Sequence, residues 1–211
     1  MKQFIKYFFI ISLIVLADQA SKLWVYAHME MGPDGQINLL GNVLKLTYTL
    51  NPAMAFSMHL GFKYEKVLIT AFRVLASLYI FWYIIQSIRR KATALWTLGW
   101  SLILGGAIGN SIDSVFYGVY LNNAPTDAPM KWLYGQVIDM LHIDLWSGFM
   151  PSWLPIWGGY YVYCLPIFNI ADVAVSAGLI VVLYAFHLKD DTNPSSLDCC
   201  NRKLKPTKNK K

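Results

Sequence analysis

Four long apolar runs constrain this chain more than any other feature of its sequence. They cover about residues 4–26, 67–88, 94–117 and 165–187. Each has ~20 or more residues, which is the length a helix needs to cross a hydrocarbon layer of ~30 Å. The composition agrees, since 56% of the residues are hydrophobic and only 14% are charged. We therefore expect a membrane all-α fold, a four-transmembrane-helix bundle formed by one domain, residues 1–188.

The basic residues predict how this bundle lies in the membrane. Lys2 and Lys6 precede the first run, residues 89–91 form a second cluster, and further lysines fill the tail, residues 189–211. The two loops between these clusters carry few basic residues. Because cytoplasmic loops carry an excess of Lys and Arg, we expect both termini in the cytoplasm and both long loops outside. The polar, basic tail is predicted to be disordered.

The net charge of +6 has a second possible meaning, a nucleic-acid partner. The basic residues stand at alternate ends of the apolar runs, so membrane topology explains them better than a nucleic-acid patch does. We therefore expect membrane lipid, and no nucleic acid, among the partners.

The first run has an alternative interpretation as a cleaved signal peptide, with Ala17 near a possible cleavage point. Against cleavage, the apolar stretch continues past Ala20 through Leu23 to Tyr26. We expect the run to be retained as the first membrane helix.

The first outer loop contains a stretch with strand character. Its strand-forming residues, Val43, Leu44, Leu46, Tyr48 and Leu50, partly alternate with other residues. This pattern predicts a small β-sheet on the extracytoplasmic surface of the membrane.

Two aspartates stand where a membrane chain would not be expected to carry them. Asp172 lies inside the fourth apolar run, and Asp139 lies in the loop just before that run. A charge in hydrocarbon costs at least ~2.5 kcal/mol, so an intramembrane carboxyl indicates a functional site. About seven residues past the outer boundary, Asp172 is predicted to lie ~10 Å deep. Two carboxyls that meet near a membrane surface suggest shared-proton chemistry.

Other polar residues collect at the same outer level. Asp18 and Lys22 share a helix face, and so do Asn110 and Asp113, while Asn169 shares a face with the aspartate of the fourth run. Each pair has a structural alternative: an ion pair or a lysine that reaches the interface for the first, a polar anchor of the helix end for the second. Their common level favours a site that opens to the outer face.

Five segments, in order, resemble the lipoprotein signal peptidase family, bacterial signal peptidase II. They read Asp18-Gln19-Ala20-Ser21-Lys22, Asn51-Pro52-Ala53-Met54-Ala55-Phe56, Gly105-Gly106-Ala107-Ile108-Gly109-Asn110-Ser111-Ile112-Asp113-Ser114, Val137-Ile138-Asp139-Met140 and Phe168-Asn169-Ile170-Ala171-Asp172. The chain departs from the family pattern in three places. Ser114 stands where the family has Arg, Ala53 where it has Gly, and Met140 where it has Phe. The chain therefore resembles a divergent member.

The resemblance implies a catalytic pair, Asp139 and Asp172. The residues alone would not favour Asp139 over Asp113 for this role. It also implies a supporting set of residues: Asp18, Lys22, Asn51, Asn110, Asp113 and Asn169. One carboxylate would take a proton from a water molecule while the other, protonated, polarises the scissile carbonyl. His142 near Asp139 is a poor basis for zinc, so no metal and no cofactor are expected.

The function that the resemblance implies is that of an intramembrane-type aspartic endopeptidase. Such an enzyme removes the signal peptide from diacylglyceryl-modified prolipoproteins, before the lipidated cysteine. We expect a multi-pass monomer in the bacterial cytoplasmic (inner) membrane, with its active site near the outer face.

Two other classes of function remain as alternatives. A small transporter or proton relay should show inverted repeats or broken helices, and neither the second nor the third run is interrupted by Pro. A non-catalytic membrane scaffold would keep its function after Asp139→Asn.

Overall fold

The computed structural model describes residues 2–52, 64–145, 147–149, 151–153, 159, 161–163 and 165–191. Its long helices are α1 (Lys2–His28), α2 (Glu65–Arg89), α3 (Ala94–Ile112) and α5 (Ile170–Asp191). A π-helical turn, η3 (Asp113–Tyr117), and the short helix α4 (Gly118–Tyr120) extend α3. Among the described residues, four spans are long and apolar enough to cross a membrane. The predicted four-helix membrane bundle is thus confirmed.

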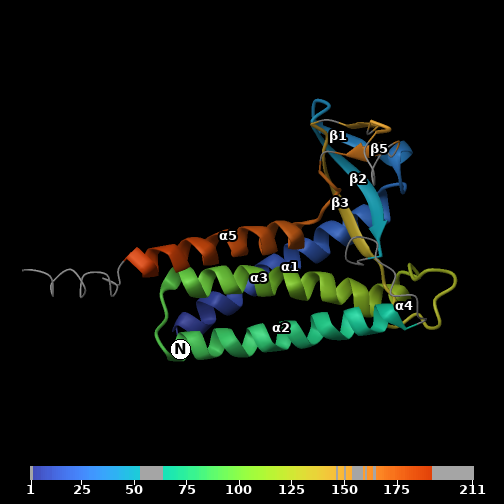
Figure 1. Ribbon diagram of the computed structural model, residues 1–211. Coiled ribbons are helices and arrows are strands. Elements are labelled where there is room, and N and C mark those ends of the chain that lie inside the picture. Colours follow the sequence, from blue (N-terminus) through green and yellow to red (C-terminus); the bar gives the residue numbers. More distant parts are fainter. Residues whose placement is uncertain are drawn as a thin grey trace, which may run out of the picture.

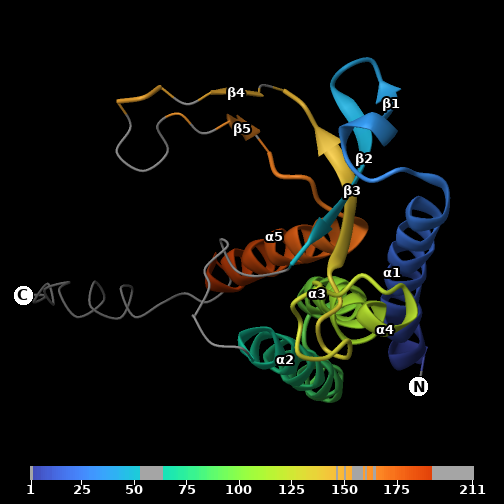
Figure 2. The same cartoon turned by 90° about the vertical axis from the view of Figure 1, so that its right-hand side faces the viewer.

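Helix α3 is the centre of the bundle and packs against α1, α2 and α5 (Figures 1 and 2). Small residues on α3 allow these close approaches. A Cβ atom on Gly106 would overlap the carbonyl oxygen of Ala171 on α5, and one on Gly109 would lie 2.6 Å from the Asp18 carboxylate on α1. Glycine at these two positions therefore brings α1 and α5 together on α3 at one level.

A small antiparallel sheet stands at one end of the bundle (Figure 1). It consists of β1 (Ile37–Leu40), β2 (Leu44–Asn51) and β3 (Val137–Ile143), in the order β1-β2-β3. A 3₁₀ turn, η1 (Pro33–Gly35), precedes β1, and a separate two-stranded sheet pairs β4 (Ser147–Phe149) with β5 (Tyr161–Tyr163) (Figure 2). The sheet predicted around β2 is confirmed, and its third strand, β3, lies in a segment where the sequence pattern indicates only a loop.

A hydrophobic core joins the sheet to the bundle. Val25 near the end of α1 packs with Tyr48 on β2, Tyr117 on η3, and Ile138 and Met140 on β3. Burying such side chains contributes about 1.5–3 kcal/mol each. Since neighbouring residues of a strand point to opposite faces, the residue between Ile138 and Met140 faces away from this core. That residue is Asp139.

Helix α5 begins later than the apolar run predicts. Phe168 forms an antiparallel bridge with Leu141 of β3, with backbone hydrogen bonds of 3.0 and 2.7 Å, so the chain is still extended there. The helix starts at Ile170. At ~1.5 Å per residue, Asp172 lies within ~5 Å of the helix start, in the first turn of α5, whereas the apolar run predicts a helix that begins several residues earlier. Its depth in the membrane stays a prediction.

Helix α2 presents polar side chains to the segments that flank the sheet. Lys66 donates to the carbonyl oxygen of Pro52, directly after β2, at 2.8 Å. One turn on, Thr70 donates to the carbonyl oxygen of Leu133, shortly before β3, at 3.1 Å. These two bonds fix the ends of β2 and β3 against the bundle. The Ala53–Phe56 part of the second motif and nearly all of the predicted tail lie outside the described residues.

Candidate active site

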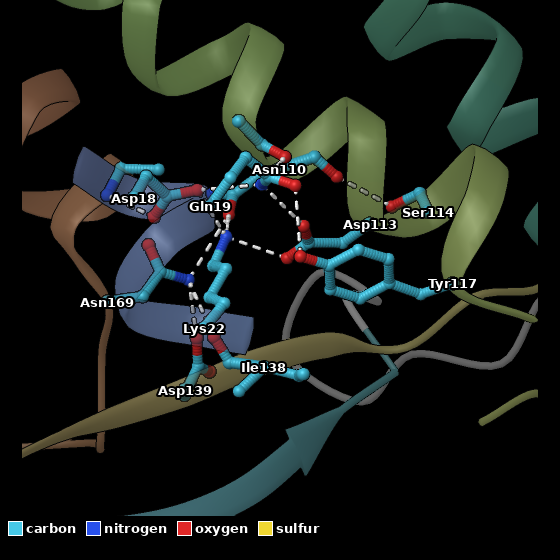
Figure 3. Close-up of polar contacts among 12 residues, drawn as sticks. Asp18, Gln19, Lys22, Asn110, Asp113, Ser114, Tyr117, Ile138, Asp139 and Asn169 are labelled. Atoms are coloured by element: carbon cyan, nitrogen blue, oxygen red, sulfur yellow. Dashed lines mark hydrogen bonds and ion pairs between the residues drawn. The ribbon is translucent and has the colours of Figure 1, made fainter. Parts of the chain in front are cut away.

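A buried ion cluster links α1 to α3 (Figure 3). The Lys22 ammonium lies 2.8 Å from the Asp18 carboxylate and 2.6 Å from that of Asp113, and all three side chains are 0% exposed. It also donates to the side-chain oxygen of Asn110 at 2.9 Å. An ammonium has three hydrogens, and these three acceptors match them. The structure thus realises the ion-pair alternative for Asp18 and Lys22.

Two further residues complete this cluster. The Gln19 amide donates to Asp113 at 2.9 Å and to Asp18 at 3.1 Å, and the Tyr117 hydroxyl donates to the Gln19 oxygen at 2.9 Å. Gln19 belongs to the first family-like motif, but the predicted set of site residues does not include it. Tyr117 had no signal in the sequence, because its place depends on the π-helical turn at the end of α3.

The start of α5 positions Asp172 through a capping box. The Asn169 side-chain oxygen accepts from the Asp172 backbone N–H at 3.0 Å, and the Asp172 carboxylate accepts from the Asn169 backbone N–H at 3.1 Å. Such a reciprocal pair satisfies backbone donors that a helix start leaves open. In the same turn, the Ala171 backbone N–H donates to Asp18 at 2.9 Å. The first turn of α5 is thus fixed both by its own side chains and by α1.

Asp139 enters the same site from β3. One carboxylate oxygen accepts from the Asn169 side-chain amide at 2.6 Å, and the other accepts from the Asn51 amide at 2.9 Å. Strand pairing explains the second contact, because β2 and β3 run side by side with Thr49 opposite Asp139. Only 2% of Asp139 is exposed.

The two aspartates meet through neutral amides. Asn169 binds Asp139 with its side-chain NH₂ and Asp172 with its backbone N–H, while Asn110 donates to the other Asp172 oxygen at 2.9 Å. Burial raises the pKa of Asp139 to about 7; the negative charge of Asp172 adds to the rise, and hydrogen bonds from Asn51 and Asn169 oppose it. An Asp139 carboxyl in this site therefore holds its proton far above the usual range of an aspartate.

All eight residues of the predicted site belong to one hydrogen-bonded network. They are Asp18, Lys22, Asn51, Asn110, Asp113, Asp139, Asn169 and Asp172. Their separate roles remain predictions. Within the described residues, no three His, Cys, Asp or Glu side chains are grouped as metal ligands.

Comparison with known proteins identifies the family. Residues 10–188 match the family described as Signal peptidase (SPase) II. The chain belongs to the signal peptidase II family. The lipoprotein signal peptidase of Amoebophilus asiaticus is 57% identical over 179 residues, which are 84% of this chain and 76% of that relative. That of Porphyromonas gingivalis is 35% identical over 188 residues, 84% of this chain and 80% of the relative.

Solved structures support the fold of this signal peptidase II. A bacterial membrane enzyme determined by the in meso method at 2.3 Å resolution superposes with a TM-score of 0.58, covering 90% of this chain and 92% of that one, at 24% identity. A second such enzyme, at 1.9 Å, gives the same TM-score at 22% identity. Family membership makes the chain an aspartic endopeptidase.

Proposed function

We propose that Asp139 and Asp172 are the catalytic pair of this signal peptidase II. The observation that carries the proposal is that Asn169 binds both carboxylates from one residue, at 2.6 and 3.1 Å. Two carboxylates held this way in a mostly buried site do not both ionise readily, so one of them keeps a proton. The raised pKa of Asp139, about 7, supports Asp139 as the carrier of that proton.

The geometry supports a division of labour between the two groups. Asp172, ionised, accepts a proton from a water molecule that attacks the scissile carbonyl carbon. Asp139, protonated, donates a hydrogen bond to the carbonyl oxygen, where negative charge develops. Asn51, Asn110 and Asn169 give each of the four carboxylate oxygens one hydrogen bond. A carboxylate oxygen has two lone pairs, so each can still bind water or substrate. The proton that Asp172 took from water then passes to the amine nitrogen as the C–N bond breaks. Asp139 keeps its own proton, so the pair returns to its starting state.

The substrates of this enzyme are prolipoproteins, from which it removes the signal peptide. More specifically, we propose that the substrate is the diacylglyceryl-modified form of the prolipoprotein, which is cleaved before the lipidated cysteine. The site supports this choice, because Asp172 lies close to the start of a membrane helix and Asp139 on the adjoining sheet. There, acyl chains can stay in the bilayer while the peptide reaches the pair.

The orientation of the four spans is also a proposal. The positions of the basic residues support both termini in the cytoplasm of a bacterium and the sheet on the outer face of its inner membrane. Single cysteines in β1 should react with a membrane-impermeant maleimide added to intact cells, and a cysteine near Lys91 should not. The reverse labelling would invert the topology. A monomer is expected to suffice for activity, since both carboxylates come from one chain.

The test of the catalytic pair is a gel-shift assay on a lipidated preprolipoprotein. Asp139→Asn and Asp172→Asn should each lower the rate by at least ~10³-fold, because neither Asn can take or give the required proton. Asp113→Asn should leave measurable product, since Asp113 belongs to the ion cluster. Asp144→Asn is the matched control outside the network, and it should cleave like the unaltered enzyme. Full turnover by Asp139→Asn would move the assignment elsewhere.

A further inference from the structure

Arg73 lies on α2, a helix that contributes none of the eight residues of the predicted site. Its guanidinium donates to the Ser114 hydroxyl at 3.3 Å, and Ser114 donates in turn to the backbone oxygen of Asn110 at 3.0 Å. Ser114 is fully buried. The guanidinium therefore contacts η3, the extension of α3, one turn beyond Asn110, which donates to Asp172.

Arg73 and Asp172 both line one cavity. The cavity has a volume of about 320 Å³ and lies between α2, α3 and α5. Its lining includes the polar residues Arg73, Asn110, Asp172 and Ser176, and among its apolar residues are Phe72, Ala107 and Val175. The guanidinium interacts electrostatically with Asp172 and Asp113. A cation and a carboxylate that face one space favour a polar group bound between them.

Lys22, the other cation of the site, does not serve this cavity. Its ammonium is 0% exposed and bonded to Asp18, Asp113 and Asn110. It is absent from the cavity lining, where Arg73 is the only cation among the described residues. The two cations thus have different surroundings, one enclosed by acceptors and one beside an open space.

The sequence adds a reason to single out Arg73. Ser114 occupies the position where the resemblance to the family leads one to expect an arginine, directly after Asp113. In this chain that serine accepts a hydrogen bond from an arginine of another helix. The positive charge beside the third-helix aspartate is therefore present, but α2 supplies it.

We propose that Arg73 is a substrate-binding residue, whose guanidinium donates to a carbonyl oxygen of the prolipoprotein while that group lies in the cavity beside Asp172. The inference rests on the proposed catalytic pair. A guanidinium has five N–H donors and no acceptor, so it suits carbonyl oxygens of the peptide backbone and of ester-linked acyl chains alike. The apolar walls suit the neighbouring aliphatic parts of the same substrate.

Substrate affinity tests this proposal separately from the chemistry. The binding assay uses the Asp139→Asn variant, which should not cleave the substrate if the catalytic proposal holds. Binding of a lipidated preprolipoprotein peptide is measured in nanodiscs and normalised to the amount of folded enzyme. Adding Arg73→Gln should weaken binding about 10- to 100-fold, the usual effect of losing a charge-assisted hydrogen bond. Adding Arg89→Gln, at the other end of α2, should change nothing. Equal affinity with and without Arg73 would overturn the proposal.

Turnover in the otherwise unaltered enzyme gives a second readout. Arg73→Gln should lower kcat/KM about 10- to 100-fold, and Arg73→Lys should recover part of the loss because it keeps one donor and the charge. Two substrates identify the oxygen: a diacylglyceryl peptide and a dialkyl ether analogue without ester carbonyls. A loss that persists with the ether analogue assigns a backbone carbonyl, and one that disappears assigns an ester. Unchanged kcat/KM for both substrates would overturn the proposal. If Asp139→Asn still cleaves, the catalytic pair fails while the affinity comparison for Arg73 still stands.

Discussion

Two pairs of aspartates lie in one network, and they differ in what stands between them. Asp18 and Asp113 have the Lys22 ammonium between their carboxylates, at 2.8 and 2.6 Å. Asp139 and Asp172 have the neutral amide of Asn169 instead. The charges of the first pair are therefore compensated by an ammonium, whereas the second pair has only neutral donors, which supports the proposal that the second pair shares a proton.

This difference explains why residues of one type serve two purposes. A cation between both carboxylates compensates their charges and fixes α1 to α3. Neutral amides orient Asp139 and Asp172 without neutralising them, as the proposed exchange of a proton by this pair requires. The comparison predicts which substitutions affect the stability of the bundle and which affect the rate.

The largest effect on stability is expected for Lys22→Met. Removing the ammonium leaves two buried carboxylates without compensation, and breaking a buried ion pair in this way costs about 3–5 kcal/mol. Thermal unfolding in detergent should show a strongly lowered Tm. The triple variant Asp18→Asn, Lys22→Met, Asp113→Asn should recover much of the loss because the stranded charges are gone. A Tm for Lys22→Met equal to that of the unaltered protein would contradict the comparison.

The next effect concerns the amide between the two aspartates that we propose as the catalytic pair. Asn169→Ala removes the capping box of α5 and the contact to Asp139, so kcat should fall about 10²-fold, as expected when a catalytic pair is misplaced by ~1 Å. The Tm should fall by the equivalent of about 0.5–2 kcal/mol, the usual cost of a lost N-cap. Initial rates and thermal melts on one preparation separate the two effects. A normal rate with a lowered Tm would show that Asn169 only caps the helix and does not position the pair.

Acidity offers a smaller and reversible test. The pKa of Asp139 is raised above its ordinary value, to about 7, so its proton is present below that pH and is lost above it. Activity should therefore decline as the pH rises through about 7, by up to tenfold per pH unit, with an apparent pKa that belongs to the pair. Initial rates of peptide cleavage between pH 5 and 9 measure this. Activity that rises throughout this range would reverse the assignment of acid and base.

The smallest effect is expected at an ion pair outside the network. Lys45 on β2 lies 2.7 Å from Asp144, but both side chains are partly exposed, at 14% and 22%. Such a pair contributes about 0–1 kcal/mol, so Lys45→Met should shift the Tm little and leave the rate unchanged. It is the matched control for Lys22→Met. A loss as large as that of Lys22→Met would show that burial does not separate the two lysines.

The fold was predictable to the extent that it depends on local pattern. Span length predicted the four helices, and the strand-forming residues predicted β2. Strand β3 could not be predicted, because it is buried on both faces over most of its length. Its sequence therefore shows no alternation of apolar and polar residues. The start of α5 was missed because hydropathy does not distinguish the extended Phe168 from a helical residue. Asn169 followed three residues later by Asp172 was the capping signal that could have placed it.

The site was predictable as a group of residues and not as a set of contacts. Topology alone placed Asp18, Lys22, Asn110, Asp113 and Asp172 at one level of the membrane, and the structure joins them. Periodicity could not separate Asp113 from Asp139, because the distinction depends on which of them receives Lys22. That pairing arises from the close approach of α1 to α3 at Gly109, a contact between distant parts of the chain.

The capping box of α5 links the integrity of this helix to the activity that we propose for Asp172. The carboxylate proposed to activate water also holds the first turn of the last span together, so unwinding that one turn would carry the group out of reach of its partner. Heat or a ligand that loosens this turn would then silence the peptidase while the remaining spans stay assembled. Loss of activity would come before loss of the bundle.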